Sequence, residues 1–213
     1  MSNPILYSYR RWPYAIRARL ALTFIDLDIE IREISLKKRP ENLYSISSKG
    51  TVPVLQTNEK VIDESIEIMK WAFSKRKKKC LDDTYKDQID LVNRNDIKFK
   101  YWLDRYKYFD RYLEHSKDFY LNKCSFYLNE YEVLLNDNKY LFGNNIDFAD
   151  LAILPFVRQF GNVDISHFKT TFKMLNHWLN NLINSKLFNS VMEKYPLWIP
   201  GNKPLIVNFK NYE

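Results

Sequence analysis

The hydrophobic pattern changes once along the chain, near residue 75, and this change constrains the fold more than any other feature. Before it, short β-branched or aromatic runs alternate with apolar residues at helical spacing. After it, apolar residues recur at helical spacing and no segment has a convincing strand pattern. The pattern therefore predicts a small mixed sheet with helices packed against it, followed by an all-helical region.

The elements of the first part follow from their composition and from the residues beside them. A strand is expected at 5–9, a helix from Pro13, a second strand at 28–34 and a short helix after Pro40. Two brief apolar runs then form a hairpin, and a helix covers 65–73. The predicted order is βαβ-α-ββα, and the domain bounds are 1–76 for the mixed part, 77–86 for a linker and 87–213 for the helical part.

Within the helical part, local signals predict helices rather than chemistry. Asp147 is a good N-cap, and Asp150, three residues later, can complete a capping box. Cys124 lies on an apolar stripe with Leu121, Leu128 and Tyr131, so a core thiol is favoured over a reactive one. A second stripe is predicted from Trp102, Tyr106, Phe109 and Leu113.

Charge and composition exclude several functions. The net charge is +7, but the chain is rich in Lys, Asn, Ile and Tyr throughout, and the dense run at 75–79 is interpreted as a solvated segment between domains. We therefore expect neither a nucleic-acid nor a membrane partner. Two cysteines and three scattered histidines argue against a disulfide framework and a metal site. No apolar run is long enough to span a bilayer and the N-terminus lacks a signal-peptide layout, so a cytoplasmic location is expected.

Six fragments, in order, resemble the soluble glutathione transferases, and most closely the bacterial members and the related omega-type branch. They are LYSYRRWPYAIRARLAL (6–22), LKKRPENL (36–43), KGTVPVL (49–55), VIDESIEIMKW (61–71), IDFADLAILPFVRQF (146–160) and VMEKYPLWIPG (191–201). The resemblance covers almost the whole chain. It implies a thioredoxin-like N-terminal domain followed by an all-helical C-terminal glutathione-transferase domain.

The resemblance also implies a glutathione site. Val52 would pair through its backbone with the cysteinyl unit of the tripeptide, and Pro53 would follow a cis peptide bond, although VPVL by itself is equally typical of a turn before a strand. Glu64 would pair with the γ-glutamyl ammonium. Ser65, at a helix N-terminus where anions are favoured, would hold the carboxylate of that group. The alternative is an ordinary helix cap.

Arg39, directly before Pro40, is the family-like candidate for the glycyl carboxylate of glutathione. Lys37 and Lys38 lie beside it and compete for the same role, so the sequence leaves this assignment open. No other cofactor is implied.

Trp12, before Pro13, occupies the position where the omega-like branch has its catalytic cysteine. An indole offers one N–H donor and no nucleophile, so cysteine-based thiol transfer through this position is ruled out. A hydroxyl near the end of the first strand would have to activate the glutathione thiol instead. Ser8, Tyr9 and Tyr14 are the candidates, with Ser8 and Tyr9 closest to the family position; Cys80 is a remote alternative nucleophile.

Two functions remain open on this basis. One is an enzyme that conjugates glutathione to a small electrophile, whose pocket would be lined by Trp102 and Tyr106 and would lie between the two halves. The other is a glutathione-binding or scaffold module with little or no turnover, which the loss of the cysteine favours. In either case a homodimer is expected from the family, and detoxification is the general role of such enzymes.

Overall fold

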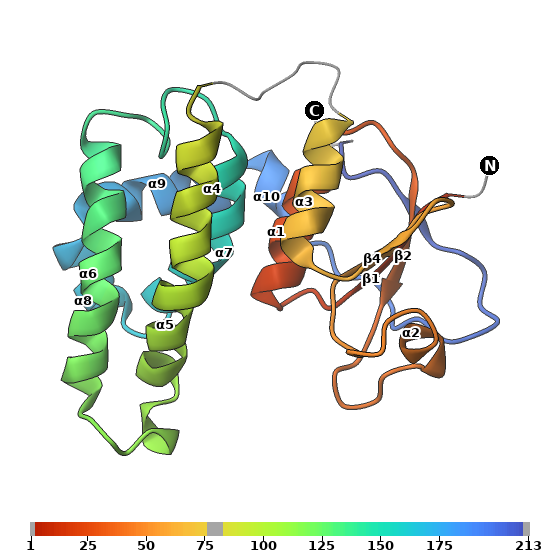
Figure 1. Ribbon diagram of the computed structural model, residues 1–213, viewed down its shortest axis with the longest axis horizontal. Coiled ribbons are helices and arrows are strands. Elements are labelled where there is room, and N and C mark those ends of the chain that lie inside the picture. Colours follow the sequence, from red (N-terminus) through yellow and green to blue (C-terminus); the bar gives the residue numbers. More distant parts are fainter. Residues whose placement is uncertain (1–2, 76–82, 211–213) are drawn as a thin grey trace. The chain divides into compact units, whose positions relative to one another are not determined.

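The structure is a computed structural model that describes residues 3–75 and 83–210. The chain divides into two compact units. The first consists of the described residues of 1–80 together with those of 184–213, and the second comprises the described residues of 81–183. Each unit is described separately below (Figure 1).

A five-stranded sheet with order β4-β3-β1-β2-β5 forms the centre of the first unit. β1 runs parallel to β2, with Ser8 opposite Glu33, and antiparallel to β3, with Tyr7 opposite Val54. The strand bounds are β1 Ile5–Ser8, β2 Ile29–Glu33, β3 Val54–Gln56, β4 Val61–Ile62 and β5 Ile206–Val207. β1 to β4 lie along the chain in the order that the sequence predicts.

Two helices pack together beside this sheet, and α1 (Pro13–Leu22) is buried on nearly all sides whereas α3 (Ser65–Ser74) buries one face. α1 and α3 lie side by side against the strands (Figure 1), and Leu20, Ile68 and Met69 are fully buried there. Side chains alternate along β1, so Tyr7 points away from α1 into a second small core with Leu43 of α2 (Glu41–Tyr44). The thioredoxin-like layout of strands and helices predicted for this part is confirmed.

The C-terminal segment belongs to the first unit, which differs from the predicted helical domain at 87–213. α10 (Lys186–Val191) packs on α1, and β5 pairs antiparallel with the edge of β2. β5 is two residues long, too short for an alternating pattern to reveal it in the sequence. The pairing depends on tertiary contact with β2. The boundaries of the predicted linker, 77–86, fall partly on residues outside the described part of the chain.

Every named element in the described residues of the second unit is a helix, as the pattern predicts, and the helices are joined by loops and one isolated β-bridge between Tyr140 and Gly143. Asp147 and Asp150 form the expected capping box at the start of α7 (Phe148–Gly161), and Cys124 is fully buried in α6 (Lys117–Asn136). The predicted stripe from Trp102 to Leu113 is wrong at its end, because α5 stops at Lys107 and Leu113 is 87% exposed. The elements are α4 Tyr85–Arg94, the π-helix η1 Asn95–Phe99, α5 Lys100–Lys107, the 3-10 helix η2 Phe109–Arg111, α6 Lys117–Asn136, α7 Phe148–Gly161, α8 Ile165–Thr171 and α9 Lys173–Ile183.

Candidate functional site

The turn between β1 and α1 places Trp12 at the N-terminus of α1. Trp12 has an extended backbone and precedes Pro13 at the first helical position, and its side chain forms no capping hydrogen bond. Its backbone N–H donates to the Tyr9 carbonyl at 3.0 Å, and the residue is 38% exposed. The first turn of α1 contains no acidic residue. The positive end of the helix dipole therefore has no counter-charge from its own first turn, and an exposed indole stands beside it.

The predicted hydroxyls differ sharply in their environments. Ser8 is fully buried, and its Oγ accepts a hydrogen bond from Nε of Arg19 at 2.8 Å. Tyr9 is half-buried and packs against the small core that contains Tyr7 and Val52. Tyr14 is also half-buried, with its ring 6.1 Å from that of Trp12. Ser8 and Tyr9 are the two candidates nearest the position where the family has its thiol-activating hydroxyl. Of these two residues, only Tyr9 has exposed surface.

Val52 and Pro53 lie directly before β3. The bond between them is cis, as the resemblance implied. The Val52 side chain is buried in the small core, and its backbone N–H and C=O have no hydrogen-bond partner among the described residues. An unpaired backbone N–H and C=O can pair with an extended peptide, as exposed strand edges do.

At the start of α3, Glu64 is the N-cap residue and Ser65 is the first helical residue. The Glu64 side chain is 59% exposed and forms an ion pair with Lys49 Nζ at 2.5 Å. Ser65 is buried, and its Oγ accepts from Nε of Arg17 at 3.0 Å. Glu64 thus presents an accessible carboxylate, whereas the Ser65 hydroxyl already has an internal partner.

Asp63 and Glu64 together form an acidic cluster before α3, and Lys49 pairs with both. Its carboxylate accepts from Ser47 Oγ at 3.0 Å and from Lys49 Nζ at 3.2 Å. Burial by itself would raise the pKa of Asp63, but the hydrogen bonds from Ser47 and Lys49 outweigh it and hold that pKa below its ordinary value. In turn, the hydrogen bonds to Glu64 and Asp63 raise the pKa of Lys49. A side-chain ammonium therefore already occupies the acidic cluster where a ligand ammonium is expected.

The remaining predicted residues lie apart from these. Arg39 is exposed in the loop before α2, next to Lys37 and Lys38. In the second unit Tyr106 is 2% exposed, with its ring 5.2 Å from Phe160, and burial raises its pKa to about 12. Trp102 is half-buried. Cys80 lies outside the described residues, as do positions 76–79 of the basic run.

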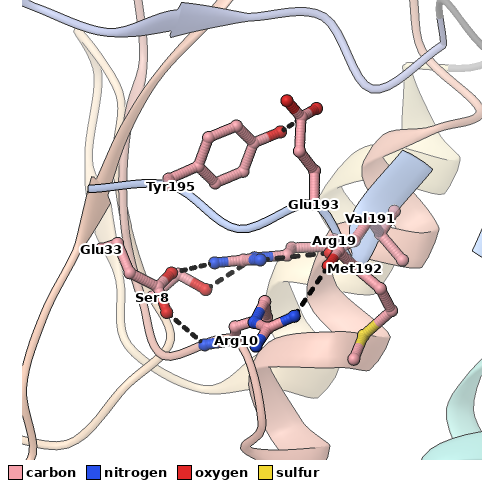
Figure 2. A network of polar contacts seen from close by, with 8 residues as sticks. All are labelled: Ser8, Arg10, Arg19, Glu33, Val191, Met192, Glu193 and Tyr195. Atoms are coloured by element: carbon pink, nitrogen blue, oxygen red, sulfur yellow. Dashed lines mark hydrogen bonds and ion pairs between the residues drawn. The ribbon is translucent and has the colours of Figure 1, made fainter. Parts of the chain in front are cut away.

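A buried polar network behind the β1–α1 turn was missed by the sequence reasoning (Figure 2). Arg19 of α1 forms an ion pair with Glu33 of β2, donates to Ser8 and donates to the Val191 carbonyl at 3.1 Å. Glu33 also accepts the backbone N–H of Arg10 at 2.6 Å. The available signal was two arginines, Arg17 and Arg19, within an otherwise largely apolar helix, and this pattern does not show which partners they meet.

The network joins three stretches of the chain. Besides the contacts of Arg19, Arg10 donates from its guanidinium to the Met192 carbonyl at 3.2 Å, and the Tyr195 ring lies 5.7 Å from the Arg19 guanidinium carbon (Figure 2). The carboxylate of Glu33 therefore holds the turn that carries Trp12, and the two arginines fasten the C-terminal segment to the same place.

Comparisons with known families agree with this architecture. The model for the glutathione S-transferase N-terminal domain matches residues 6–79, and the model for the glutathione S-transferase C-terminal domain matches residues 111–186. This chain belongs to the glutathione S-transferase family. Human glutathione S-transferase omega-2 is 39% identical over 62 residues, which are 29% of this chain and 26% of that protein, so the match spans about a quarter of the relative's length.

Solved structures of similar fold agree with this architecture. Poplar glutathione transferase F1 aligns with a TM-score of 0.74 and 23% identity over 90% of this chain and 97% of its own. A glutathione transferase family member from Pseudomonas fluorescens, solved with two glutathione molecules bound, aligns with a TM-score of 0.74 and 16% identity over 90% and 92%. These likenesses show the fold, and the omega-like branch stays a prediction.

Two further properties concern the described residues alone. None of their helices has both the length and the apolar character that crossing a membrane requires. No group of three or more His, Cys, Asp or Glu side chains within 3–75 and 83–210 is placed to hold a metal ion.

Proposed function

We propose that this chain binds glutathione in its first unit and conjugates it to a small electrophile. The observation that carries the proposal is the unpaired backbone of Val52 beside the acidic start of α3. The peptide backbone of glutathione would pair with Val52, and its γ-glutamyl ammonium would meet the carboxylate of Glu64. Family membership supports glutathione as the ligand, and two proteins of similar fold have been solved with glutathione or a derivative of it.

Ser65 and Arg39 would complete the recognition of glutathione. The γ-glutamyl carboxylate fits the N-terminus of α3, where the backbone N–H groups favour an anion and the Ser65 hydroxyl, which accepts from Arg17, still has its own O–H to donate. Arg39 would hold the glycyl carboxylate. Lys37 and Lys38 are equally exposed, so Arg39 is distinguished from them by its position before Pro40 and by the family resemblance.

The chemistry would take place at the N-terminus of α1. The positive end of the helix dipole would favour the thiolate of bound glutathione, and a hydrogen bond from Tyr9 would stabilise it further. The thiolate sulfur would then form a bond to the electrophilic carbon, with the thiol proton lost to solvent and the leaving group expelled. Trp12 would cover the sulfur on its exposed side and contribute no nucleophile. That Trp102 and Tyr106 line the pocket of the electrophile stays a prediction from the resemblance.

A glutathione-binding module with little or no turnover is the second candidate. The burial of Ser8 favours it, because that hydroxyl is already hydrogen-bonded to Arg19 and removes one of the two nearest candidates for thiol activation. Lys49 also favours weak binding, because it occupies the carboxylates that glutathione would need.

Retention on immobilised glutathione, together with the rate of conjugation of an aryl halide, separates the two candidates. Retention with turnover that falls in Tyr9→Phe supports the enzyme. Retention without turnover supports the binding module, and no interaction at millimolar glutathione refutes both. Trp12→Cys tests the position before Pro13 independently, because it should create reduction of glutathione mixed disulfides that the natural chain lacks.

Homodimerisation, a cytoplasmic location and a role in detoxification accompany this proposal as expectations from the family. Light scattering of the purified chain measures the first directly.

A further inference from the structure

The connection between α5 and α6 carries the most exposed large apolar residue in the described part of the chain. α5 and α6 run side by side, and η2 and a short loop join them at one end (Figure 1). Leu113 in this loop is 87% exposed, and Phe109 in η2 is 43% exposed. Single apolar residues on a surface are ordinary, so the surroundings of these two decide whether they have a role.

The surroundings are basic and aromatic. The guanidinium carbon of Arg105, on α5, lies 4.6 Å from the ring centre of Tyr112, in the loop. The cationic groups of Lys107 and Arg111 both lie 4.8 Å from the ring centre of Tyr108. Each of these three cations therefore rests against an aromatic ring, and one of these contacts connects the loop to α5.

The first turns of α6 continue the same arrangement. Lys117 Nζ lies 5.1 Å from the ring centre of Phe109, and this contact connects α6 to η2. Lys123 Nζ, further along α6, lies 5.2 Å from the ring centre of Phe119. Contacts between cations and rings thus join α5, η2, the loop and the start of α6. We call the surface formed by residues 105–123 the α5–α6 tip.

The cations of the α5–α6 tip keep their charge available. None of its five lysines and arginines forms an ion pair with a described residue, whereas Lys100, just before the tip, is paired with Asp104. Three acidic residues lie in the same stretch, so its net charge is +2 with histidine neutral. Glu114 accepts from the Tyr120 hydroxyl at 3.2 Å, and Asp118 lies in the first turn of α6, where the helix dipole offsets its charge. The tip therefore presents an excess of cations to an anionic partner.

We propose that the α5–α6 tip docks the protein on the surface of a bilayer that contains anionic lipids. Leu113 and Phe109 enter the boundary between headgroups and acyl chains, the tyrosines lie at the level of the headgroups, and the cations meet the anionic headgroups. The docking does not depend on glutathione binding. It departs from the sequence-based expectation of no membrane partner, because only the structure shows that these cations are unpaired and that Leu113 is exposed.

Two other partners fit the tip less well. A single-stranded nucleic acid would stack its bases on free aromatic faces, whereas Lys107 and Arg111 both lie over Tyr108 and Leu113 offers no ring. A second copy of this chain, in two-fold contact at the tip, would bring the same excess of cations together. An anionic bilayer accepts apolar side chains and cations at the same time, and the tip exposes both.

The test is co-sedimentation of the full chain with lipid vesicles in the absence of glutathione. One set of vesicles contains phosphatidylcholine alone, and the other contains phosphatidylcholine and phosphatidylserine in equal amounts. We expect binding to the anionic vesicles to be tighter on the order of tenfold or more, and to weaken with added salt because charge attraction is screened. Equal binding to both sets, or binding to neither, would overturn the proposal.

Charge substitutions separate the tip from the net charge of +7 that the whole chain carries. Lys107→Ala with Arg111→Ala should weaken binding to the anionic vesicles on the order of tenfold. The control is Lys139→Ala with Lys169→Ala. It removes the same charge from exposed residues of the second unit that form no ion pair with a described residue, and it should change binding little. Equal losses in the two double variants would assign the binding to general charge and refute the tip.

Leu113→Ser tests the apolar contact. It should weaken binding to the anionic vesicles on the order of tenfold, whereas Phe126→Ser, at a residue that is 73% exposed on α6 outside the tip, should not. Leu113 is almost fully exposed, so folding is not at risk. Unchanged binding in Leu113→Ser would refute insertion of the tip.

Two further measurements decide against the other partners. Light scattering that shows a smaller particle for Leu113→Ser than for the natural chain would assign the tip to a second copy and refute the proposal. Binding of a single-stranded oligonucleotide that Lys107→Ala with Arg111→Ala abolishes, without binding to vesicles, would assign the tip to nucleic acid. Retention on immobilised glutathione is a separate readout, so this inference and the proposed function can fail independently.

Discussion

Two clusters of charged side chains in the first unit have similar chemistry and opposite exposure. In one, Arg19 and Glu33 pair with side-chain exposures of 0% and 7%, and every polar partner belongs to the chain. In the other, Lys49 meets Asp63 and Glu64 with exposures of 47%, 32% and 59%. Removing one member of a buried pair leaves a charge that water cannot reach, whereas water or a ligand can replace an exposed partner. We infer that the first cluster maintains the fold and the second is available for recognition.

The largest effect is expected from Arg19→Met, which leaves the Glu33 carboxylate buried without its ion partner. The loss in free energy of unfolding should be about 3–5 kcal/mol, measured by urea denaturation. The matched control is Arg94→Met, which breaks the exposed pair with Glu130 and should cost less than about 1 kcal/mol.

A double variant shows whether the uncompensated charge is the cause. Glu33→Gln, combined with Arg19→Met, removes the charge and keeps a carbonyl oxygen for the Arg10 backbone N–H. It should recover more than half of the lost stability. Equal losses in Arg19→Met and Arg94→Met would remove the contrast between the two clusters.

Asp150 sharpens the comparison, because it is a buried carboxylate whose partners are hydrogen-bond donors rather than a cation. It accepts from the Leu141 and Asp147 backbone N–H groups and from the Trp178 indole. Burial raises its pKa from 3.8 to about 6 despite these hydrogen bonds. The folded state therefore keeps the proton up to about pH 6, whereas the unfolded chain releases it near its ordinary value.

The sign of the pH dependence follows from this difference. The stability contributed by protonated Asp150 is fully present below pH 3.8 and is lost as the pH rises through about 6. The free energy of unfolding of the natural chain, minus that of Asp150→Asn, should therefore fall across this interval, by up to roughly 3 kcal/mol. Thermal or urea unfolding at several pH values measures it, and a constant difference would contradict it.

The contrast between the clusters also explains what the sequence could predict. The strands at 5–9 and 28–34, the helix from Pro13 and the cis bond before Pro53 follow from local patterns or from the family resemblance. The Arg19–Glu33 pair does not, because two residues 14 positions apart meet only after β1 and β2 have paired and α1 has packed on them. The sequence did not predict β5 for the same reason, because its two residues form a strand only by pairing with β2, near the other end of the chain.

The candidate site divides in the same way. Val52, Glu64 and Ser65 could be predicted because family motifs are local stretches of sequence. That Ser8 is buried against Arg19, and that Lys49 already pairs with Glu64, depends on side chains brought together by folding. The sequence therefore predicts candidate site residues but not which of them already have partners.

Within the exposed cluster, a substitution of Glu64 should have a moderate effect on the affinity for glutathione. Glu64→Gln keeps a hydrogen-bond acceptor and removes the charge that would meet the γ-glutamyl ammonium, so affinity for glutathione should fall on the order of tenfold. Isothermal titration calorimetry measures it. Glu67→Gln, which removes an equally exposed acid paired with Lys70 on the same helix, should change affinity little. Similar losses in both variants would assign the effect to the general charge of α3.

The smallest effect, and the one most specific to the comparison, is expected from Lys49→Met. Hydrogen bonds to Glu64 and Asp63 raise the pKa of Lys49, so it stays cationic through the neutral range and competes with the ligand ammonium. Removing it should tighten glutathione binding by about twofold to fivefold, because exposed ion pairs are weak. Lys70→Met removes a comparably exposed cation paired with an acid of α3 and is the matched control. Weaker binding in Lys49→Met would mean that Lys49 contacts glutathione itself. Lys49 would then be part of the binding site rather than a cation that the ligand displaces.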